Sequence, residues 1–403
     1  MIPISDLSGD VEAAMNMDRL VCMGLMANAL LCASAALARD SLFVLGASTV
    51  SELDASTGAV LRKFPVPNDA IDLVGSSSGA FLYVVHFGNP PAAGQLSVID
   101  LDREVVEMIR TPANPVRLAF DRGGRFGYLI SVNPDGISRF DAAERLLLPI
   151  GTLLGHGRDL LVGESVAHIV QPTGLLAFDL YAQMVIAAVG GGANNASMFV
   201  DQAQQVAYVA DIGPTTDGVV LPGALHIFSL NPLFRSSTIP VGLTPTDVVY
   251  SSWSGEVFVA NRDSNSISVI DPVLKAVVGS YEINMPGGLA ISRDGRSLYA
   301  SSSSDATVHF IDLESDTVRE VPCDPQPSIV SILSKRTGVS CPGDCDGNGE
   351  VQVHEIVALS SIASGTGDLS SCRDGDRDDN GHISIDELIS SVTSAYRGCA
   401  LSF

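Results

Sequence analysis

The sequence predicts an all-β fold, a seven-bladed β-propeller of four-stranded blades, followed by a small domain of calcium-binding loops and helices. Short apolar runs separated by turn residues recur about every 40 to 50 residues, which is the period of propeller blades. Two acidic segments near the C-terminus match the EF-hand calcium loop. The N-terminal region has the layout of a secretory signal. The chain is therefore divided into a leader and signal peptide (1–38), a propeller (39–338) and a calcium module (339–403).

The signal segment is Met17–Ala38, which offers Arg19, then an apolar run, then Ala36-Leu37-Ala38 as a small-residue cleavage site. Cleavage is expected after Ala38, and Met17 is a second candidate for the translation start. An uncleaved anchor is the alternative, although the run is short and rich in Ala for a spanning helix. The protein is predicted to be secreted, periplasmic or held at the cell surface by bacterial-type export. No transmembrane segment is expected after cleavage.

The repeat is clearest in Val257–Gly295. It holds four apolar runs that are too short for stable helices and rich in β-branched residues, so each is predicted to be a strand. The Asp294-Gly295 step after the fourth run suits a tight hairpin turn. The four runs begin at Val257, Ile267, Ala276 and Leu289.

Two positions recur through the seven copies. The first strand of each copy carries a ring, and the second strand ends in an acidic residue, with Ser229 in the fifth copy. A repeated Asp is interpreted as a turn residue or an intra-blade hydrogen-bond residue rather than a catalyst, because catalysis needs one constellation rather than seven. One four-stranded sheet cannot bury both faces alone, so the copies are expected to stack around an axis. The rings are Phe43, Tyr83, Tyr128, His168, Tyr208, Phe258 and Tyr299, and the acids are Asp54, Asp100, Asp141, Asp179, Asp271 and Asp312.

The ends of the array predict how the ring closes. The first copy, at Leu42–Leu45, starts on the second strand of a blade, and the last copy ends with a first strand at Ser328–Leu333. One blade should therefore combine a C-terminal inner strand with three N-terminal strands, which removes free sheet edges. The consensus YVAN…ISVID…P…LAIS.DG over Ser41–Gly338 resembles the YVTN-type β-propeller repeat family, with Phe258–Asn261 among the closest matches. The resemblance implies the fold and leaves the function open, since propellers host unrelated activities.

The C-terminal segment carries the strongest chemical signal. Asp344–Glu355 and Asp376–Glu387 both match D-x-[DN]-x-[DN]-G-x₅-E, whose oxygens converge on a hard cation as the chain turns. Two bidentate Glu residues favour two Ca²⁺ ions over Mg²⁺, and an acidic linker is the alternative. The predicted ligands are Asp344, Asp346, Asn348, Glu350, Gln352 and Glu355 in the first loop, and Asp376, Asp378, Asn380, His382, Ser384 and Glu387 in the second.

An apolar helical pattern follows each loop, at Ile356–Ala363 and Leu388–Ala395, while no entry helix is expected before either loop. This loop-then-helix arrangement, with GDCDGNGEVQVHEI at residues 343–356, resembles the dockerin-like modules of secreted bacterial proteins. Position 12 is Glu here, whereas dockerins usually carry Asp. The resemblance therefore implies calcium binding rather than a particular protein partner.

Cysteine usage agrees with export. The propeller up to Pro322 has none, and five cysteines cluster towards the acidic tail, as in a disulfide-stapled module of an oxidising compartment. Cys323 is expected to be the odd one. The remaining four, Cys341, Cys345, Cys372 and Cys399, allow three pairings.

The sequence favours a non-enzymatic role, in which calcium binding is coupled to recognition of an unknown protein or polysaccharide on a propeller rim. Two long hairpin loops, His86–Gln95 and Ile212–Gly223, should lie on the rim of the blade-to-blade connections, where they either bind a ligand or merely vary in length. A net charge of −23 argues against nucleic acid. The alternative is a propeller enzyme, lactonase or polysaccharide-acting, with an attachment module. It would need His, Asp or Glu converging on one rim, and the sequence shows no such cluster. A redox-partner propeller, a third option, lacks haem-attachment signals.

Overall fold

The computed structural model describes residues 40–76, 79–88, 94–112, 114–121, 124–142, 144–153, 155–163, 165–334, 343–345, 351–367, 372, 375 and 383–397. The predicted signal segment and its cleavage site lie outside these residues, as do Cys341 and Cys399. None of the described helices has the length and apolarity that crossing a bilayer would require.

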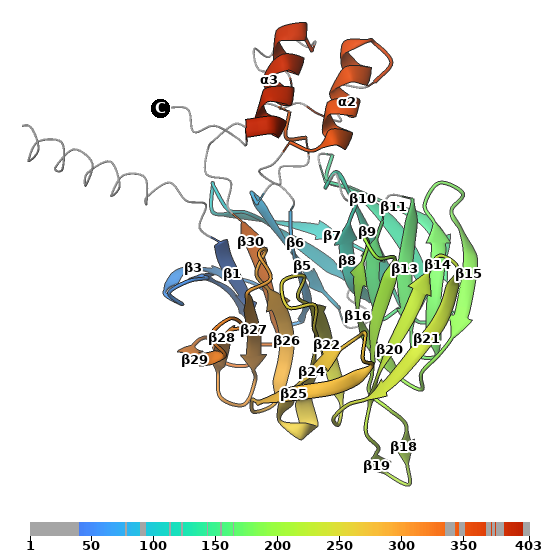
Figure 1. The fold of residues 1–403 in the computed structure, drawn as a ribbon, viewed down its shortest axis with the longest axis vertical. Helices are drawn as coiled ribbons and strands as arrows, with labels where there is room; N and C mark the ends of the chain where they lie inside the picture. The colour runs from blue at the N-terminus through green and yellow to red at the C-terminus, as the bar shows by residue number, and fades with distance from the viewer. Residues whose placement is uncertain are drawn as a thin grey trace, which may run out of the picture. The chain divides into compact units, whose positions relative to one another are not determined.

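The described residues form seven four-stranded antiparallel sheets, the blades, which are named here from the inner strand outward (Figure 1). Blade 1 is β30 (Ile329–Ser334), β1 (Asp40–Leu45), β2 (Thr49–Asp54) and β3 (Val60–Pro65). Blade 2 is β4 (Ala70–Gly75), β5 (Phe81–His86), β6 (Gln95–Asp100) and β7 (Val105–Arg110). Blade 3 is β8 (Pro115–Phe120), β9 (Phe126–Ser131), β10 (Gly136–Asp141) and β11 (Leu146–Thr152). Blade 4 is β12 (Asp159–Val162), β13 (Val166–Gln171), β14 (Gly174–Asp179) and β15 (Met184–Gly190).

Blade 5 is β16 (Asn195–Asp201), β17 (Val206–Asp211), β20 (Ala224–Leu230) and β21 (Leu233–Pro240). A separate hairpin of β18 (Thr215–Thr216) and β19 (Val219–Val220) lies in its β17–β20 connection. Blade 6 is β22 (Pro245–Tyr250), β23 (Val257–Asn261), β24 (Ser266–Asp271) and β25 (Ala276–Glu282), with a short 3-10 turn at Arg262–Ser264. Blade 7 is β26 (Pro286–Ile291), β27 (Ser297–Ser302), β28 (Thr307–Asp312) and β29 (Thr317–Pro322).

The ring closes as predicted, through a blade shared by the two ends of the repeat array. The C-terminal strand β30 pairs with β1 over the whole length of both strands, from Asp40 opposite Ser334 to Leu45 opposite Ile329. The inner strands of consecutive blades contact one another all the way round, including β26 with β30 and β30 with β4. The four strands predicted within Val257–Gly295 are β23 to β26, and the inner strand of a blade is indeed the LAIS-type strand.

The two repeated positions have the structural roles that the sequence predicts. The ring of each copy is buried between blades, as with Phe43 and Phe258, which are fully buried. In six of the seven blades the third strand ends in an aspartate that accepts hydrogen bonds from backbone N–H groups of the turn that follows, whereas blade 5 has Ser229 at this position. In blade 6, for example, the Asp271 Oδ1 atom lies 2.8 Å from the backbone N of Val273 and 2.9 Å from that of Leu274. These aspartates are therefore turn caps, since each satisfies donors that the turn leaves without a ladder partner.

The C-terminal segment forms two helices, α2 (Val353–Ala363) and α3 (Ile385–Arg397), which contact each other. They match the two helical patterns that the sequence places after the loops. Their small core is Leu359, Cys372 and Ile383, with Cys345, Ile362 and Leu388 packed against it. A disulfide joins Cys345 to Cys372, one of the pairings left open by the sequence, and Cys323 is free.

Candidate functional site

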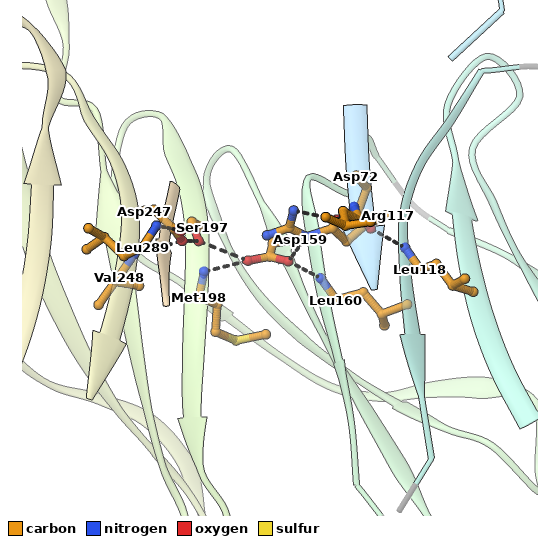
Figure 2. A network of polar contacts seen from close by, with 11 residues as sticks. Asp72, Arg117, Leu118, Asp159, Leu160, Ser197, Met198, Asp247, Val248 and Leu289 are labelled. Carbon is orange, nitrogen blue, oxygen red and sulfur yellow. Dashed lines mark hydrogen bonds and ion pairs between the residues drawn. The ribbon is translucent and has the colours of Figure 1, made fainter. Parts of the chain in front are cut away.

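The inner strands bring one equivalent residue per blade to the axis of the ring. Five of these residues are polar and form a continuous network near the starts of their strands, called here the axial ring (Figure 2). The axial ring consists of Asp72 on β4, Arg117 on β8, Asp159 on β12, Ser197 on β16 and Asp247 on β22.

Each aspartate of the axial ring joins its own blade to the next. One carboxylate oxygen accepts a hydrogen bond from the backbone N–H of the following residue, and the other accepts one from the neighbouring inner strand. The Asp72 carboxylate thus lies 2.9 Å from the backbone N of Leu118, and the Asp159 carboxylate lies 2.6 Å from that of Met198. The Asp247 carboxylate lies 2.8 Å from the backbone N of Leu289. Blades 2 and 3, 4 and 5, and 6 and 7 are linked in this way.

Arg117 and Ser197 link the remaining neighbours in this part of the ring. The Arg117 guanidinium reaches Asp159 at 2.6 Å and Asp72 at 2.9 Å, and the Ser197 hydroxyl donates to Asp247 at 2.7 Å. The network is therefore unbroken from blade 2 to blade 7. Between blades 7 and 1 the inner strands approach too closely for a side chain at this position, because a Cβ on Gly288 would come within 2.9 Å of the Ile329 Cα atom.

The electrostatics of the axial ring follow from its burial. The side chains of Asp72 and Asp159 are only 3% and 4% exposed, and that of Arg117 is 27% exposed. Burial raises the pKa of Asp72, against the opposing attraction of Arg117, and burial likewise raises the pKa of Asp247. Burial alone would lower the pKa of Arg117, and the carboxylates of Asp159 and Asp72 outweigh it and raise that pKa. The guanidinium is therefore a fixed positive charge that opposes the rise in the pKa of Asp72.

Four members of the axial ring, all except Ser197, line a cavity of about 510 Å³. Arg262, Ser303 and the turn before β30 also line it. Every carboxylate oxygen of the three aspartates already accepts at least one hydrogen bond, so the first role of the network is to hold the blades together. The described residues contain no group of three or more His, Cys, Asp or Glu side chains arranged to hold a metal ion.

This convergence of acids is a correction to the sequence analysis, which found no such cluster. The missed signal lies near the start of the inner strands: the third residue is Asp72 in Ala-Ile-Asp, Arg117 in Pro-Val-Arg and Asp247 in Pro-Thr-Asp, and Asp159 begins β12. Comparing that position between copies, rather than searching for a motif within one copy, would have found the ring.

Blade 2 contains a Ser-His-Asp arrangement that resembles a hydrolase triad in distances. The Ser97 Oγ atom lies 2.7 Å from His86 Nε2, and His86 Nδ1 lies 3.2 Å from Asp69 Oδ1. Ser97 is fully buried and donates to the Met108 sulfur. Burial also lowers the pKa of His86. A nucleophile that no substrate can reach does not catalyse, so this set is structural.

Polar pairs at the same two strand positions in other blades support that conclusion. Blade 5 has Asp211 with His226, at 3.0 Å, and blade 6 has Asn261 with Ser268, at 2.9 Å. Burial would raise the pKa of Asp211, but the hydrogen bonds from His226 and from three backbone N–H groups prevail and lower it to about 2. The arrangement is a repeated way of satisfying a buried polar position within a blade.

The predicted calcium ligands are only partly described. Asp344, Gln352, Glu355, Ser384 and Glu387 lie within the described residues, and the other seven, Asp346, Asn348, Glu350, Asp376, Asp378, Asn380 and His382, lie outside them. Of the described ligands, Asp344, Glu355 and Glu387 are buried.

The described ligands occupy equivalent positions at the ends of the two loops. In the first loop, the Glu355 carboxylate accepts a hydrogen bond at 2.7 Å from the backbone N of Gln352 and another at 2.7 Å from that of Cys345. In the second loop, the Glu387 carboxylate accepts one at 2.8 Å from the backbone N of Ser384. Positions 9 and 12 thus form the capping arrangement of a helix N-terminus in both loops. In the first loop, the position-12 carboxylate also meets the residue next to position 1.

Comparison with known proteins is informative at the level of structure only. No family model and no curated protein matches the sequence. Similar solved structures include the periplasmic gluconolactonase PpgL of Pseudomonas aeruginosa, with a TM-score of 0.59 and 16% identity over 73% of this chain and 99% of that one. A putative 6-phosphogluconolactonase of Bacteroides fragilis has a TM-score of 0.58 and 13% identity, covering 73% and 98%. A functionally unknown protein of Desulfotomaculum acetoxidans has a TM-score of 0.60 and 13% identity, covering 73% and 99%. At such identities these likenesses establish the fold alone.

Proposed function

We propose that this protein is exported, binds two calcium ions through its C-terminal module, and uses its propeller as a scaffold for recognition outside the cytoplasm. One observation carries the calcium proposal. The position-12 glutamates of both loops, Glu355 and Glu387, are buried, with 1% and 7% exposure, at matching positions of two helix N-termini. In a loop of this spacing a glutamate at position 12 supplies two oxygens to the cation, so this matched placement supports two calcium sites.

The donor set supports calcium as that cation. Every predicted ligand atom is an oxygen. Glu350 and His382 would contribute backbone carbonyls and the other residues their side chains, and hard oxygen donors suit Ca²⁺. Glu355 lies where its carboxylate meets the start of the same loop, as closure around a cation requires. The Cys345–Cys372 disulfide joins position 2 of the first loop to the segment before the second loop, which supports an exported, oxidised module.

The recognition part of the proposal rests on the rim that carries the connections between second and third strands. In blade 5 this connection bears the β18–β19 hairpin, on which Val219 is 61% exposed. Exposed apolar side chains on a loop held by a rigid scaffold suit contact with a partner. A protein or polysaccharide bound on this rim is the proposed ligand of the propeller.

Calcium titration of the full-length protein by isothermal calorimetry tests the calcium proposal. Two sites are expected, and Glu355→Gln and Glu387→Gln should each weaken one of them about ten-fold or more, because position 12 supplies two oxygens and a full charge. Glu282→Gln, at an exposed strand end of blade 6, is the matched control and should leave both sites unchanged. Absence of binding at millimolar calcium with the disulfide intact would refute the proposal.

A lactonase is the second candidate, and the axial cavity favours it. Three aspartates and an arginine line a cavity of about 510 Å³ on the axis of the ring, and two of the similar structures are a periplasmic gluconolactonase and a putative 6-phosphogluconolactonase. Hydrolysis of glucono-δ-lactone and of 6-phosphogluconolactone, followed by proton release, tests this candidate. Turnover by the wild type that is lost in Asp247→Asn would favour the enzyme, provided that circular dichroism shows this variant to be folded. Absence of turnover with both lactones would reject it.

A further inference from the structure

A second and larger cavity, of about 980 Å³, lies between blades 4 and 5 and shares no lining residue with the axial cavity. Its lining includes residues of the β12–β13, β16–β17 and β20–β21 turns, such as Gly163, Gln202 and Asn231. On β12, Val162 at the end of the strand lines this cavity, whereas Asp159 at the start of the strand lines the axial cavity. The two cavities are therefore on opposite rims of the propeller.

The cavity exists because blade 4 departs from the repeat at two paired positions. His168 replaces the large ring that other copies carry, and its partner across the strand pair is Ala177, which in turn lies opposite Ala187. The other copies pair larger side chains at these positions. They are Phe43 with Glu52, Tyr83 with Val98, Tyr128 with Arg139, Tyr208 with Ile227, Phe258 with Val269, and Tyr299 with Phe310.

The burial of His168 without a hydrogen-bond partner among the described residues also points to a ligand in this cavity. His168 is 7% exposed, lines the cavity, and makes no hydrogen bond to any described residue, and its Nδ1 atom is buried. Burying an imidazole without a partner costs free energy, so native structures usually supply one. Burial lowers the pKa of His168 to about 4, and the ring is therefore neutral at pH 7. A neutral imidazole offers one donor and one acceptor.

The lining selects the class of ligand. None of the described residues that line the cavity is charged, although the whole chain has a net charge of −23. Val166, Ile186 and Leu233 contribute apolar surface, and Gln202 and Asn231 contribute neutral polar groups. The volume falls within the range of small-molecule sites. An ionic ligand would lose its hydration without gaining a counter-charge there.

We propose that the cavity between blades 4 and 5 binds a small uncharged organic molecule with an apolar body and one hydrogen-bonding group, which pairs with the imidazole of His168. This site shares no lining residue with the axial cavity and contains none of the predicted calcium ligands. It gives the propeller a small-molecule ligand on the rim opposite the one proposed for recognition.

The test is a fluorescence titration of the full-length protein with N-phenyl-1-naphthylamine, a neutral two-part aromatic amine with one N–H group. The wild-type protein should bind it saturably at one site. His168→Tyr combined with Ala177→Val restores residues that other blades carry at these positions, so the variant is expected to fold while filling the cavity. Its dissociation constant should rise about ten-fold or more. His156→Tyr, the same change at an exposed histidine, is the matched control and should bind as the wild type does.

A second measurement on the wild type does not depend on any variant folding. With histidine labelled at ¹³Cε1, the imidazole resonance of His168 should shift as the probe is added, while that of His309 in blade 7 should not. No saturable binding to the wild type would overturn the proposal. Equal binding by the filled variant, or a fluorescence rise without a shift at His168, would place the probe elsewhere and overturn it as well.

Discussion

Replacing Arg117 by Met should destabilise the propeller more than any surface change, because two buried carboxylates lose their counter-ion. Arg117 pairs with Asp159 at 2.6 Å and with Asp72 at 2.9 Å. Removing one partner of a buried ion pair typically costs about 3–5 kcal/mol. Both aspartates keep their backbone N–H donors and Arg117 is partly exposed, so a loss of about 3 kcal/mol at pH 7 is expected.

The loss should depend on pH in a definite direction. The pKa of Asp72 is already raised by burial, and Arg117 is the charge that opposes this rise. Without Arg117 the folded state holds the Asp72 proton at pH values where the unfolded chain has released it. The free energy of unfolding of the variant therefore falls as pH rises above about 4, the ordinary value for Asp. The penalty should be greatest at pH 7 and smallest near pH 4.

Urea unfolding at several pH values, followed by far-ultraviolet circular dichroism, measures the free energy of unfolding of the variant and of the parent. Arg103→Met is the matched control, since Arg103 is 82% exposed and pairs with Asp100 at 3.3 Å. An exposed pair of this kind is worth less than about 1 kcal/mol. If Arg117→Met costs no more than the control at pH 7, or costs the same at pH 4 and pH 7, the counter-ion argument is wrong.

Two further predictions concern the closure of the propeller and the buried side chain of His168. Ending the chain at Pro327 removes β30, leaves β1 and the inner face of blade 1 without a partner, and should abolish the sharp thermal transition of the propeller; a truncated protein that melts as sharply as its parent would contradict the closure. His168→Phe should remove a group whose pKa falls from 6.5 to about 4 on folding. Since the unfolded chain binds that proton more readily, the parent loses stability as pH falls from about 6.5 to about 4, and the variant should gain on it by up to about 3 kcal/mol in urea titrations at these two pH values. A gap between the two proteins that does not change with pH would refute the assignment.

Most of the fold could be predicted because its evidence lies within single copies. The apolar runs from Val257 and Ile267 are β23 and β24, and the turn caps repeat at the ends of the third strands. Closure could be predicted from the phase of the first and last copies. The helices after the two acidic loops could also be predicted, since a 3.6-residue apolar period is a local signal.

The polar sites could not be predicted as easily, because they depend on register and on contacts between blades. Asp72, Arg117 and Asp159 are about 40 residues apart in sequence and meet only when inner strands align around the axis. The sequence placed His168 at a ring position, yet its pairing with Ala177 follows from the strand register alone. The Ser97–His86–Asp69 set shows the reverse, because correct distances carry no catalytic meaning without exposure.

The shared blade also sets the order in which the molecule can be completed during synthesis. Strands β1 to β3 emerge first, but their inner partner β30 follows after all the other blades. At about 5–20 residues per second, the delay is on the order of tens of seconds. During this interval the edge of β1 is open to pairing with other chains. A chaperone that shields the N-terminal strands would act in this interval, and a chain halted before residue 329 would remain an open ring.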